Sequence, residues 1–254
     1  MKKATKIRIG VYVGLYFLLG LVLFLCQRSF VYYPVKEVTH HYPREILKNE
    51  GEQISVLKMN EGQSEAVIYF GGNGESVVYA ASDLEQLCVA KSLYLMEYRG
   101  YGTSTGSPSQ KAIFSDALKL YDSLKVKYDK IHLIGRSLGT GVAIYLASQR
   151  DVDKLVLITP YDSIQSLAQK RIPIYPMSLI LTEKYPSIDR VGDLKNQTLI
   201  LLAEDDEIIP MSHSQKLITA FTNTLPQVEM IKNAGHNDLS DRQDYREELK
   251  SFLK

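Results

Sequence analysis

IHLIGRSLGTG, residues 131–141, is an apolar strand pattern that runs into a glycine-flanked serine and then into a helical pattern. A serine between such a strand and helix lies on a sharp, strained turn that exposes its hydroxyl and directs the next backbone amide toward a developing oxyanion. Short glycine–serine patterns also occur by chance in structural turns, but this one stands between a strand and a helix. We therefore predict Ser137 as a nucleophile and the Leu138 N–H as an oxyanion donor.

The rest of the chain alternates short apolar runs with longer amphipathic stretches. Several runs, such as LVLIT and LILLA, are apolar throughout, as expected for strands buried on both faces of a parallel sheet. The predicted strands are 54–57, 66–70, 92–98, 131–135, 154–159, 198–203 and 228–231, and the predicted helices are 76–90, 110–127, 138–150, 212–222 and 238–252. This alternation predicts an α/β fold with a mostly parallel central sheet flanked by helices, and an active site at the carboxyl ends of its strands.

The N-terminus predicts a membrane anchor. Residues 9–26 carry no charge, and at 1.5 Å per residue they span roughly 27 Å, close to the thickness of a bilayer core. We predict an anchor over residues 1–33, with a transmembrane helix at about 9–27, and a catalytic domain over residues 34–254. A cleaved signal peptide is the alternative, but the apolar stretch is longer than a usual signal core and no small-x-small cleavage site follows it.

Charges on the two sides of this segment are unequal. Four basic residues precede it, at positions 2, 3, 6 and 8, whereas only Arg28 and Lys36 follow closely. By the positive-inside tendency we expect a cytoplasmic N-terminus, with the catalytic domain on the extracytoplasmic side.

Composition excludes several other classes of function. The net charge of +1 offers no electrostatic basis for nucleic-acid binding. Cys26 and Cys88 have no cysteine or histidine nearby at metal-ligand spacing. We therefore expect no metal and no cofactor, and the expected partners are the membrane and an acyl substrate.

A nucleophilic serine needs a base to take its proton. His236, in KNAGHND, follows the last predicted strand and precedes the last predicted helix, so its loop can reach over the serine. We predict surface or structural roles for the other histidines, which are His40, His41, His132 and His213. The acid that orients the base should fall between serine and histidine, where TLILLA is followed by Glu204-Asp205-Asp206-Glu207. Position alone does not choose between Asp205 and Asp206.

Further motifs make the sequence resemble the α/β-hydrolase superfamily, in the branch of small membrane-anchored hydrolases related to serine aminopeptidase-like and depalmitoylase-like members. EYRGYGTSTGSPS, residues 97–109, resembles that branch's loop after the fourth strand, and the resemblance extends from about residue 70 to residue 236. The branch's acid motif ends in an aliphatic residue and proline. Laid on this chain, it implies Asp206 as the acid and Pro210 as the closing proline, with Ala203 in place of a glycine.

The expected oxyanion loop departs from the family pattern. Relatives often carry His-Gly-Asn after the third strand, whereas this chain reads FGGNGES over residues 70–76, with glycine in place of the histidine. Because an oxyanion hole needs a backbone amide, the loss of the imidazole need not disable it. The resemblance implies the Asn73 N–H as second donor, with Gly74 close behind. A phosphate-binding loop is the alternative, but the Walker lysine is missing.

The substrate is the least determined feature. Residues of about 164–193 predict a short cap, too small for a large lid domain, with apolar stretches at 172–177 and 179–181. Such a surface can admit an acyl chain, or it can simply pack as a core helix. We expect a serine hydrolase that cleaves a carboxylic ester or thioester of lipid-like character through an acyl-enzyme. A serine peptidase of the aminopeptidase-like type and a non-catalytic membrane-anchored binding module are the alternatives.

Overall fold

A computed structural model describes residues 3–254, so Lys2, part of the basic flank, lies outside the described residues. The fold is built on one eight-stranded sheet in the order β1-β2-β4-β3-β5-β6-β7-β8. Strands β1 and β2 run antiparallel to their neighbours, and the pairs from β4 through β8 are parallel, which confirms the predicted mostly parallel sheet. The strands are β1 (Arg44–Asn49), β2 (Glu52–Met59), β3 (Glu65–Phe70), β4 (Ser92–Met96), β5 (Lys130–Arg136), β6 (Lys154–Ile158), β7 (Gln197–Ala203) and β8 (Gln227–Ile231).

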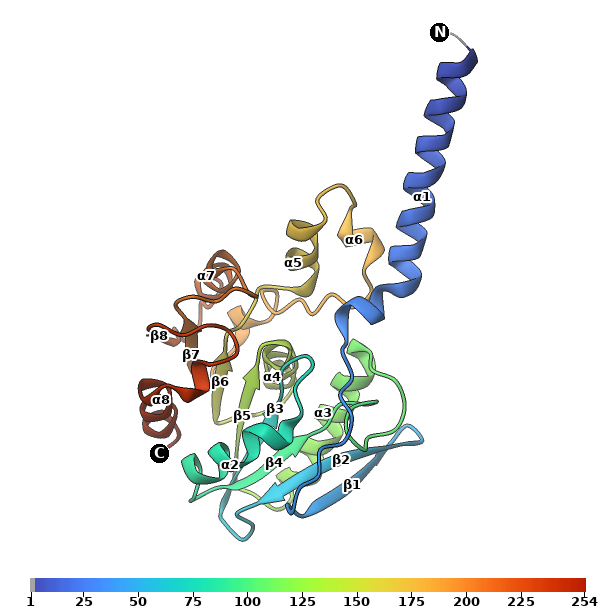
Figure 1. Ribbon diagram of the computed structural model, residues 1–254. Helices are drawn as coiled ribbons and strands as arrows, with labels where there is room; N and C mark the ends of the chain where they lie inside the picture. The colour runs from blue at the N-terminus through green and yellow to red at the C-terminus, as the bar shows by residue number, and fades with distance from the viewer. Residues whose placement is uncertain (1–2) are drawn as a thin grey trace.

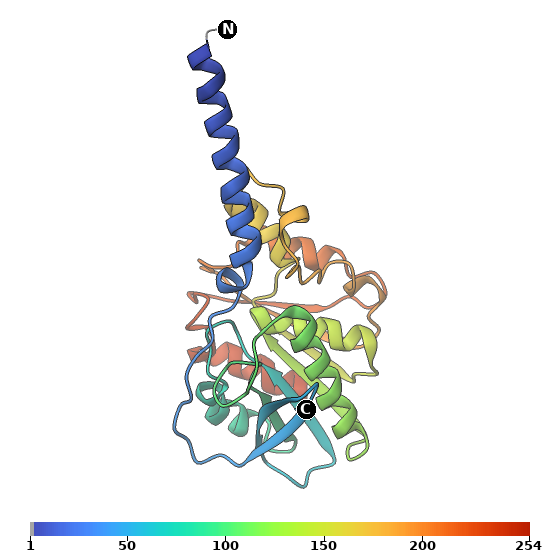
Figure 2. The same cartoon turned by 90° about the vertical axis from the view of Figure 1, so that its right-hand side faces the viewer.

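Helices cover both faces of this sheet, as Figures 1 and 2 show. One face packs against α3, α4 and α7, and the other against α2 and α8. The helices are α1 (Lys3–Val31), α2 (Val77–Leu87), α3 (Gln110–Lys125), α4 (Leu138–Gln149), α5 (Ile164–Arg171), α6 (Met177–Ile180), α7 (Met211–Thr219) and α8 (Gln243–Leu253), with 3-10 turns η1 (Val191–Asp193) and η2 (Leu239–Asp241).

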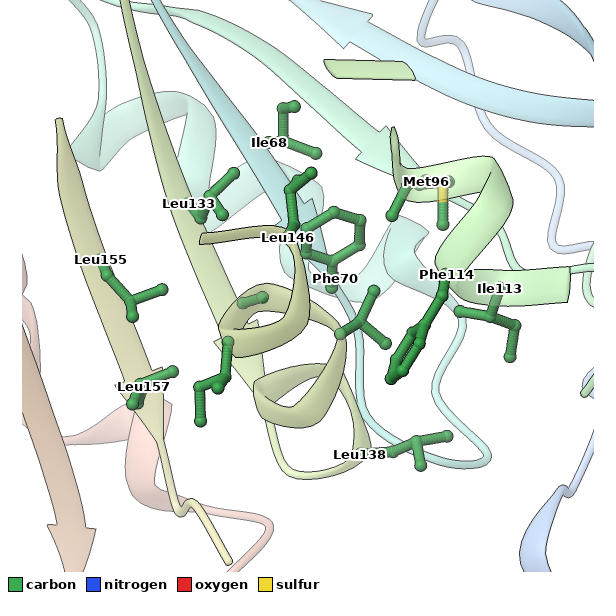
Figure 3. Close-up of a cluster of buried hydrophobic side chains, with 14 of the residues drawn as sticks. Ile68, Phe70, Met96, Ile113, Phe114, Leu133, Leu138, Leu146, Leu155 and Leu157 are labelled. Atoms are coloured by element: carbon green, nitrogen blue, oxygen red, sulfur yellow. The ribbon is translucent and has the colours of Figure 1, made fainter. Parts of the chain in front are cut away.

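The largest core lies between the sheet and helices α3 and α4. Side chains of β3 and β5, such as Phe70 and Leu133, meet Phe114 of α3 and Leu146 of α4 (Figure 3). Helix α4, LGTGVAIYLASQ, is apolar around most of its circumference, and it is buried over most of its length. A helix that is apolar on all sides is one that the fold encloses. The turn that enters α4 is therefore held in the centre of the molecule.

Strand β1 was not predicted. Its sequence, REILKN, is mostly polar, and it pairs only with β2 at the edge of the sheet. An edge strand needs neither a continuous apolar run nor strict alternation, because only one of its sides is paired and little of it is buried.

Helix α1 projects from the domain (Figure 1). Residues 5–31 are long and apolar enough to cross a membrane, and large apolar side chains such as Leu25, 68% exposed, cover its surface. One side of the end of α1 is different, because Gln27 and Val31 are buried, as is Tyr32, which follows the helix. The predicted division after residue 33 therefore follows a segment that already packs with the catalytic domain.

Residues 164–193, the predicted cap, comprise α5, α6 and η1. Tyr185 and Val191, near its end, belong to the main core, whereas the apolar side chains of its middle part do not. Tyr175, Met177, Ile180 and Leu181 form a separate small cluster that also contacts Leu23 of α1.

Candidate active site

Ser137, the predicted nucleophile, has a strained backbone in the sharp turn between β5 and α4, which we call the elbow. Ser137 has φ 48° and ψ −114°, a left-handed conformation that is costly for a residue with a side chain, by about 1–3 kcal/mol. Its N–H donates to the Ile158 carbonyl at 2.9 Å, which ties the turn to β6. Such strain is maintained only where the surrounding structure fixes it.

The flanking glycines permit the close approach of strand and helix. A Cβ on Gly139 would lie 2.1 Å from the Phe70 carbonyl oxygen of β3, and a Cβ on Gly135 would lie 2.5 Å from the Gly139 carbonyl oxygen. Neither backbone atom can move out of the way, so both positions require glycine. The Gly-x-Ser-x-Gly spacing thus follows from packing around the turn.

The structure brings the three predicted triad residues together. The His236 Nε2 atom lies 2.9 Å from the Ser137 Oγ, and its Nδ1 atom lies 2.9 Å and 3.0 Å from the two carboxylate oxygens of Asp206. All three side chains are largely buried. Since a carboxylate only accepts, the imidazole carries its proton on Nδ1, and Nε2 is left to accept from the serine hydroxyl.

The acid in contact with the histidine is Asp206. Its Oδ1 atom also accepts from the N–H groups of Ile208 at 2.9 Å and Ile209 at 2.7 Å, which fix the carboxylate within its turn. Asp205 is exposed, and its backbone N–H donates to the Ala234 carbonyl at 2.9 Å. That backbone bond joins the acid loop to the histidine loop.

The predicted oxyanion loop lies against the elbow. A Cβ on Gly72 would be 3.6 Å from the Ser137 Cβ, but the Gly72 N–H already donates to Glu75 Oε2 at 2.7 Å. Over residues 3–254, no protein acceptor takes the N–H of Asn73 or of Leu138. The Asn73 side chain is occupied, because its Oδ1 accepts from Tyr33 N at 3.0 Å. The two predicted donors, the N–H groups of Asn73 and Leu138, are therefore free to bind an anion.

Sequence reasoning missed an ion pair that holds this loop. Glu75 Oε2 accepts from Arg136 Nη1 at 2.9 Å as well as from Gly72, and Glu75 Oε1 accepts from Tyr69 Oη at 2.6 Å. Arg136 Nη2 reaches the His236 carbonyl oxygen at 3.2 Å. Burial, the largest single effect, lowers the pKa of Arg136, but the charge and hydrogen bond of Glu75 together with the nearby tyrosines raise it above its ordinary value, so the guanidinium stays charged. One pair thus joins the oxyanion loop, the elbow and the histidine loop.

Two further acids hold the histidine loop. Glu207 Oε2 accepts from the His236 N–H at 3.1 Å, and Asp238 Oδ1 accepts from the Gly235 N–H at 2.6 Å. Neighbouring acids after β7 therefore contact different parts of His236, since Asp206 binds its imidazole and Glu207 binds its backbone N–H. The family's acid motif had singled out Asp206, but nothing in the sequence indicated the role of Glu207.

A cavity of about 610 Å³ opens onto Ser137 and His236. This volume is within the range of pockets that hold small organic ligands. Its walls are mostly apolar and come from three segments of the chain. They are the end of α1 (Leu23, Gln27, Phe30 and Val31), the cap (Ile164, Leu167, Ala168, Arg171, Ile172, Met177, Ile180 and Leu181) and the loop after β7 (Ile208 and Ile209).

A second buried histidine–aspartate pair lies elsewhere. His213 Nδ1 is 2.7 Å from Asp162 Oδ1, which also accepts from the Ser163 N–H at 2.8 Å. Neither His213 nor Asp162 lines the cavity that contains Ser137. The pair joins the start of α7 to the turn after β6.

Comparison with known proteins identifies the family. The sequence model of the dienelactone hydrolase family matches residues 96–251, which include Ser137, Asp206 and His236. The chain belongs to the dienelactone hydrolase family. Within the α/β-hydrolase superfamily, this family member is 31% identical over 199 residues to an uncharacterised protein of Mycobacterium tuberculosis, a match that covers 76% of this chain and 70% of that one.

Other relatives agree. The alpha/beta hydrolase domain-containing protein aho-3 of Caenorhabditis elegans is 32% identical over 168 residues, covering 64% of this dienelactone hydrolase family member and 48% of the relative, about half of its length. Among solved structures, the Pyrococcus furiosus esterase Pf2001 superposes with a TM-score of 0.70 over 87% of this chain and 98% of that one, at 15% identity. The likeness to the esterase is one of fold. Family and fold together make this protein an α/β-fold hydrolase.

Proposed function

We propose that this hydrolase is a membrane-anchored serine esterase or thioesterase whose nucleophile, base and acid are Ser137, His236 and Asp206. The observation that carries the proposal is the continuous chain of hydrogen bonds from the serine hydroxyl through the imidazole to the carboxylate. The arrangement meets the geometric requirement for nucleophilic acyl transfer, since base and nucleophile lie within hydrogen-bond reach and a third group orients the base.

The reaction proceeds in two halves. The Ser137 oxygen attacks the acyl carbon as its proton moves to His236 Nε2, and Asp206 stabilises the imidazolium. The carbonyl oxygen becomes an oxyanion, which accepts from the Leu138 and Asn73 amides. The bond to the leaving alcohol or thiol breaks, and that group takes the proton from His236. Water then gives its proton to His236 and attacks the acyl-enzyme, and the carboxylic acid leaves as the proton returns to Ser137.

The apolar cavity favours an acyl substrate over a peptide. Its walls are mainly aliphatic side chains of α1, the cap and the loop after β7, so the surface beside Ser137 is suited to a hydrocarbon chain. Among known structures of this fold is an esterase, which is consistent with ester chemistry.

We also propose that α1 anchors the protein to the membrane with its N-terminus in the cytoplasm and the catalytic domain outside. The exposed apolar surface of α1 supports an anchor, and the basic flank supports the orientation. A cleaved signal peptide is disfavoured because Gln27 and Tyr32 are buried in the domain. A reporter that is active only in the cytoplasm, fused after Lys254, should therefore be inactive. Reporter activity would show that the catalytic domain lies in the cytoplasm and contradict the proposed orientation.

Labelling of the full chain with a fluorophosphonate tests the proposed chemistry. The wild type should be labelled on Ser137, identified by peptide mass spectrometry, and Ser137→Ala should not be labelled while keeping its thermal stability. p-Nitrophenyl esters and peptide amides then separate the candidate activities. A folded wild type that is not labelled would favour the binding module, and faster cleavage of amides than of esters would favour the peptidase.

A further inference from the structure

Buried polar contacts fix the end of α1 to the cap. Gln27, only 6% exposed, accepts from the Thr182 N–H at 2.6 Å and donates to the Ile180 carbonyl at 3.3 Å. Glu183 is also buried, and it accepts from Arg28 Nε at 3.1 Å and from Tyr32 Oη at 2.6 Å. Because Gln27, Glu183 and Tyr32 are buried, losing these contacts would cost free energy, so they hold the helix and the cap in one relative position.

The cap also follows α1 into its uncharged segment. The Tyr16 hydroxyl donates to the Ile174 carbonyl at 2.9 Å, the Tyr175 hydroxyl donates to the Tyr16 carbonyl at 2.9 Å, and the two tyrosine rings stack at 4.6 Å. Tyr16 lies about 18 Å along the helix from Arg28 at 1.5 Å per residue. Figure 1 shows the segment between α5 and α6 reaching up beside α1. If α1 crosses a bilayer, this segment lies at the depth of the hydrocarbon.

The tip of the cap, residues 172–181, has the properties that hydrocarbon requires. Its exposed side chains are apolar except for Ser178, and Ile174 is 67% and Leu179 80% exposed. Pro173 and Pro176 have no N–H to satisfy. Most of the remaining backbone donors have acceptors within the protein, as a segment in lipid must. These donors are the N–H groups of Ile172, Tyr175, Met177, Leu179, Ile180 and Leu181.

The cavity above Ser137 lies between these two elements. Leu23 and Phe30 of α1 line one side, and Ile172 and Met177 of the cap line another. The anchor is therefore a wall of the active site as well as an attachment to the membrane.

We infer that the cap tip lies in the bilayer beside α1, and that the groove between them takes the acyl chain of a long-chain ester directly from the hydrocarbon to Ser137. The inference rests on the proposed esterase activity and membrane anchor. It adds that the substrate enters from the bilayer and that its acyl chain is the part recognised. A substrate that enters this way need not leave the bilayer, so that the cost of exposing its chain to water is avoided.

Tryptophan fluorescence tests the position of the cap tip. The chain contains no tryptophan, so one introduced residue is the only source of indole emission. Leu179→Trp in the full chain, reconstituted in phosphatidylcholine vesicles, should be strongly quenched by lipids brominated on their acyl chains. Val126→Trp, at an equally exposed site following α3, is the control and should not be quenched. Equal quenching of the two variants would overturn the inference.

Chain-length selectivity tests the groove. Leu23→Trp fills the groove from the α1 side, and we expect the ratio of long-chain to short-chain ester hydrolysis in vesicles to fall about tenfold, the usual scale for steric selection in an apolar pocket. Leu25→Trp, on the same helix but outside the cavity, should keep the wild-type ratio.

The outcomes separate the two proposals. An unchanged ratio in Leu23→Trp, with fluorophosphonate labelling of Ser137 intact, would refute the groove and leave the esterase standing. A wild type that is neither labelled nor active on any ester would refute the esterase itself.

Discussion

The ion pair between Glu75 and Arg136 yields the most specific prediction. Replacing Glu75 by glutamine keeps the size of the side chain and one oxygen acceptor, but it removes the charge that Arg136 faces. It also removes one of the two oxygens, of which Oε1 accepts from Tyr69 and Oε2 from Gly72 and Arg136. Because Gly72 lies beside Ser137, a weaker hold on this loop loosens the neighbouring Asn73 amide. Glu75→Gln should therefore lower both stability and turnover.

The magnitude follows from burial. The Glu75 side chain is 9% and the Arg136 side chain 21% exposed, so the pair is mostly removed from water. Removing one partner of a fully buried pair costs about 3–5 kcal/mol. Since Arg136 keeps the His236 carbonyl and partial exposure, we expect about 2 kcal/mol, or about 4–8 °C in Tm for a chain of this size. Complete loss of an oxyanion donor costs about 100-fold or more, so a loosened donor should lower kcat about tenfold.

The assay is thermal unfolding in detergent together with ester hydrolysis below the transition. Asp83→Asn is the matched control, because Asp83 pairs with Arg246 at 3.0 Å at the surface, where such pairs contribute less than about 1 kcal/mol. A double-mutant cycle with Arg136→Met isolates the pair. If Glu75→Gln leaves Tm and kcat at wild-type values, or if the cycle shows no coupling, the argument for this ion pair is wrong.

Three further predictions concern the acid, the elbow and the sheet. Asp206→Asn should lower kcat by about 10⁴-fold, as loss of the orienting acid does in serine proteases, and Asp205→Asn should change it less than tenfold; the opposite order would exchange their roles. Gly139→Ala should prevent stable folding, seen as loss of the cooperative unfolding transition, because its Cβ would lie 2.1 Å from a backbone oxygen of β3; a normal Tm would contradict this packing. The hydrogen bond from Lys91 lowers the pKa of Glu65 from 4.5 to about 2, against the opposing effect of burial. Between pH 4.5 and about 2 the unfolded chain therefore binds more protons than the folded one, and the free energy of unfolding falls as the pH drops through this range. In urea unfolding, Glu65→Gln should lose less stability than the wild type over this pH range. An equal loss in the two proteins would contradict the role given to Glu65.

Much of the fold was predictable from the sequence because its central strands are buried on both faces. The runs LVLI and LILLA are apolar at every position, as expected for strands of a parallel sheet that is covered by helices on both faces. The elbow was predictable for a related reason, since Gly135 and Gly139 are imposed by backbone contacts shorter than any side chain permits. These constraints are local, and a single sequence displays them.

The contacts that organise the site were harder to predict from the sequence. Glu75 and Arg136 are separated by more than sixty positions, as are Gln27 and Thr182, and no periodicity marks which distant polar groups meet. The docking of the cap on α1 was missed for this reason. The apolar cap was predicted as either an acyl surface or a core helix, and in the structure it packs beside α1 and lines the cavity that contains Ser137.

The two buried histidine–aspartate pairs show why His236, and not His213, is the proposed base. The His213–Asp162 distance of 2.7 Å is shorter than the 2.9 Å between His236 and Asp206, and both pairs are buried. Geometry within the pair thus does not select the base. The difference lies in what the second ring nitrogen faces, because His236 Nε2 meets the strained Ser137 hydroxyl in a cavity with free backbone amides nearby. An imidazole oriented by a carboxylate becomes a base only where a proton donor and an acceptor for the resulting oxyanion meet at the same point.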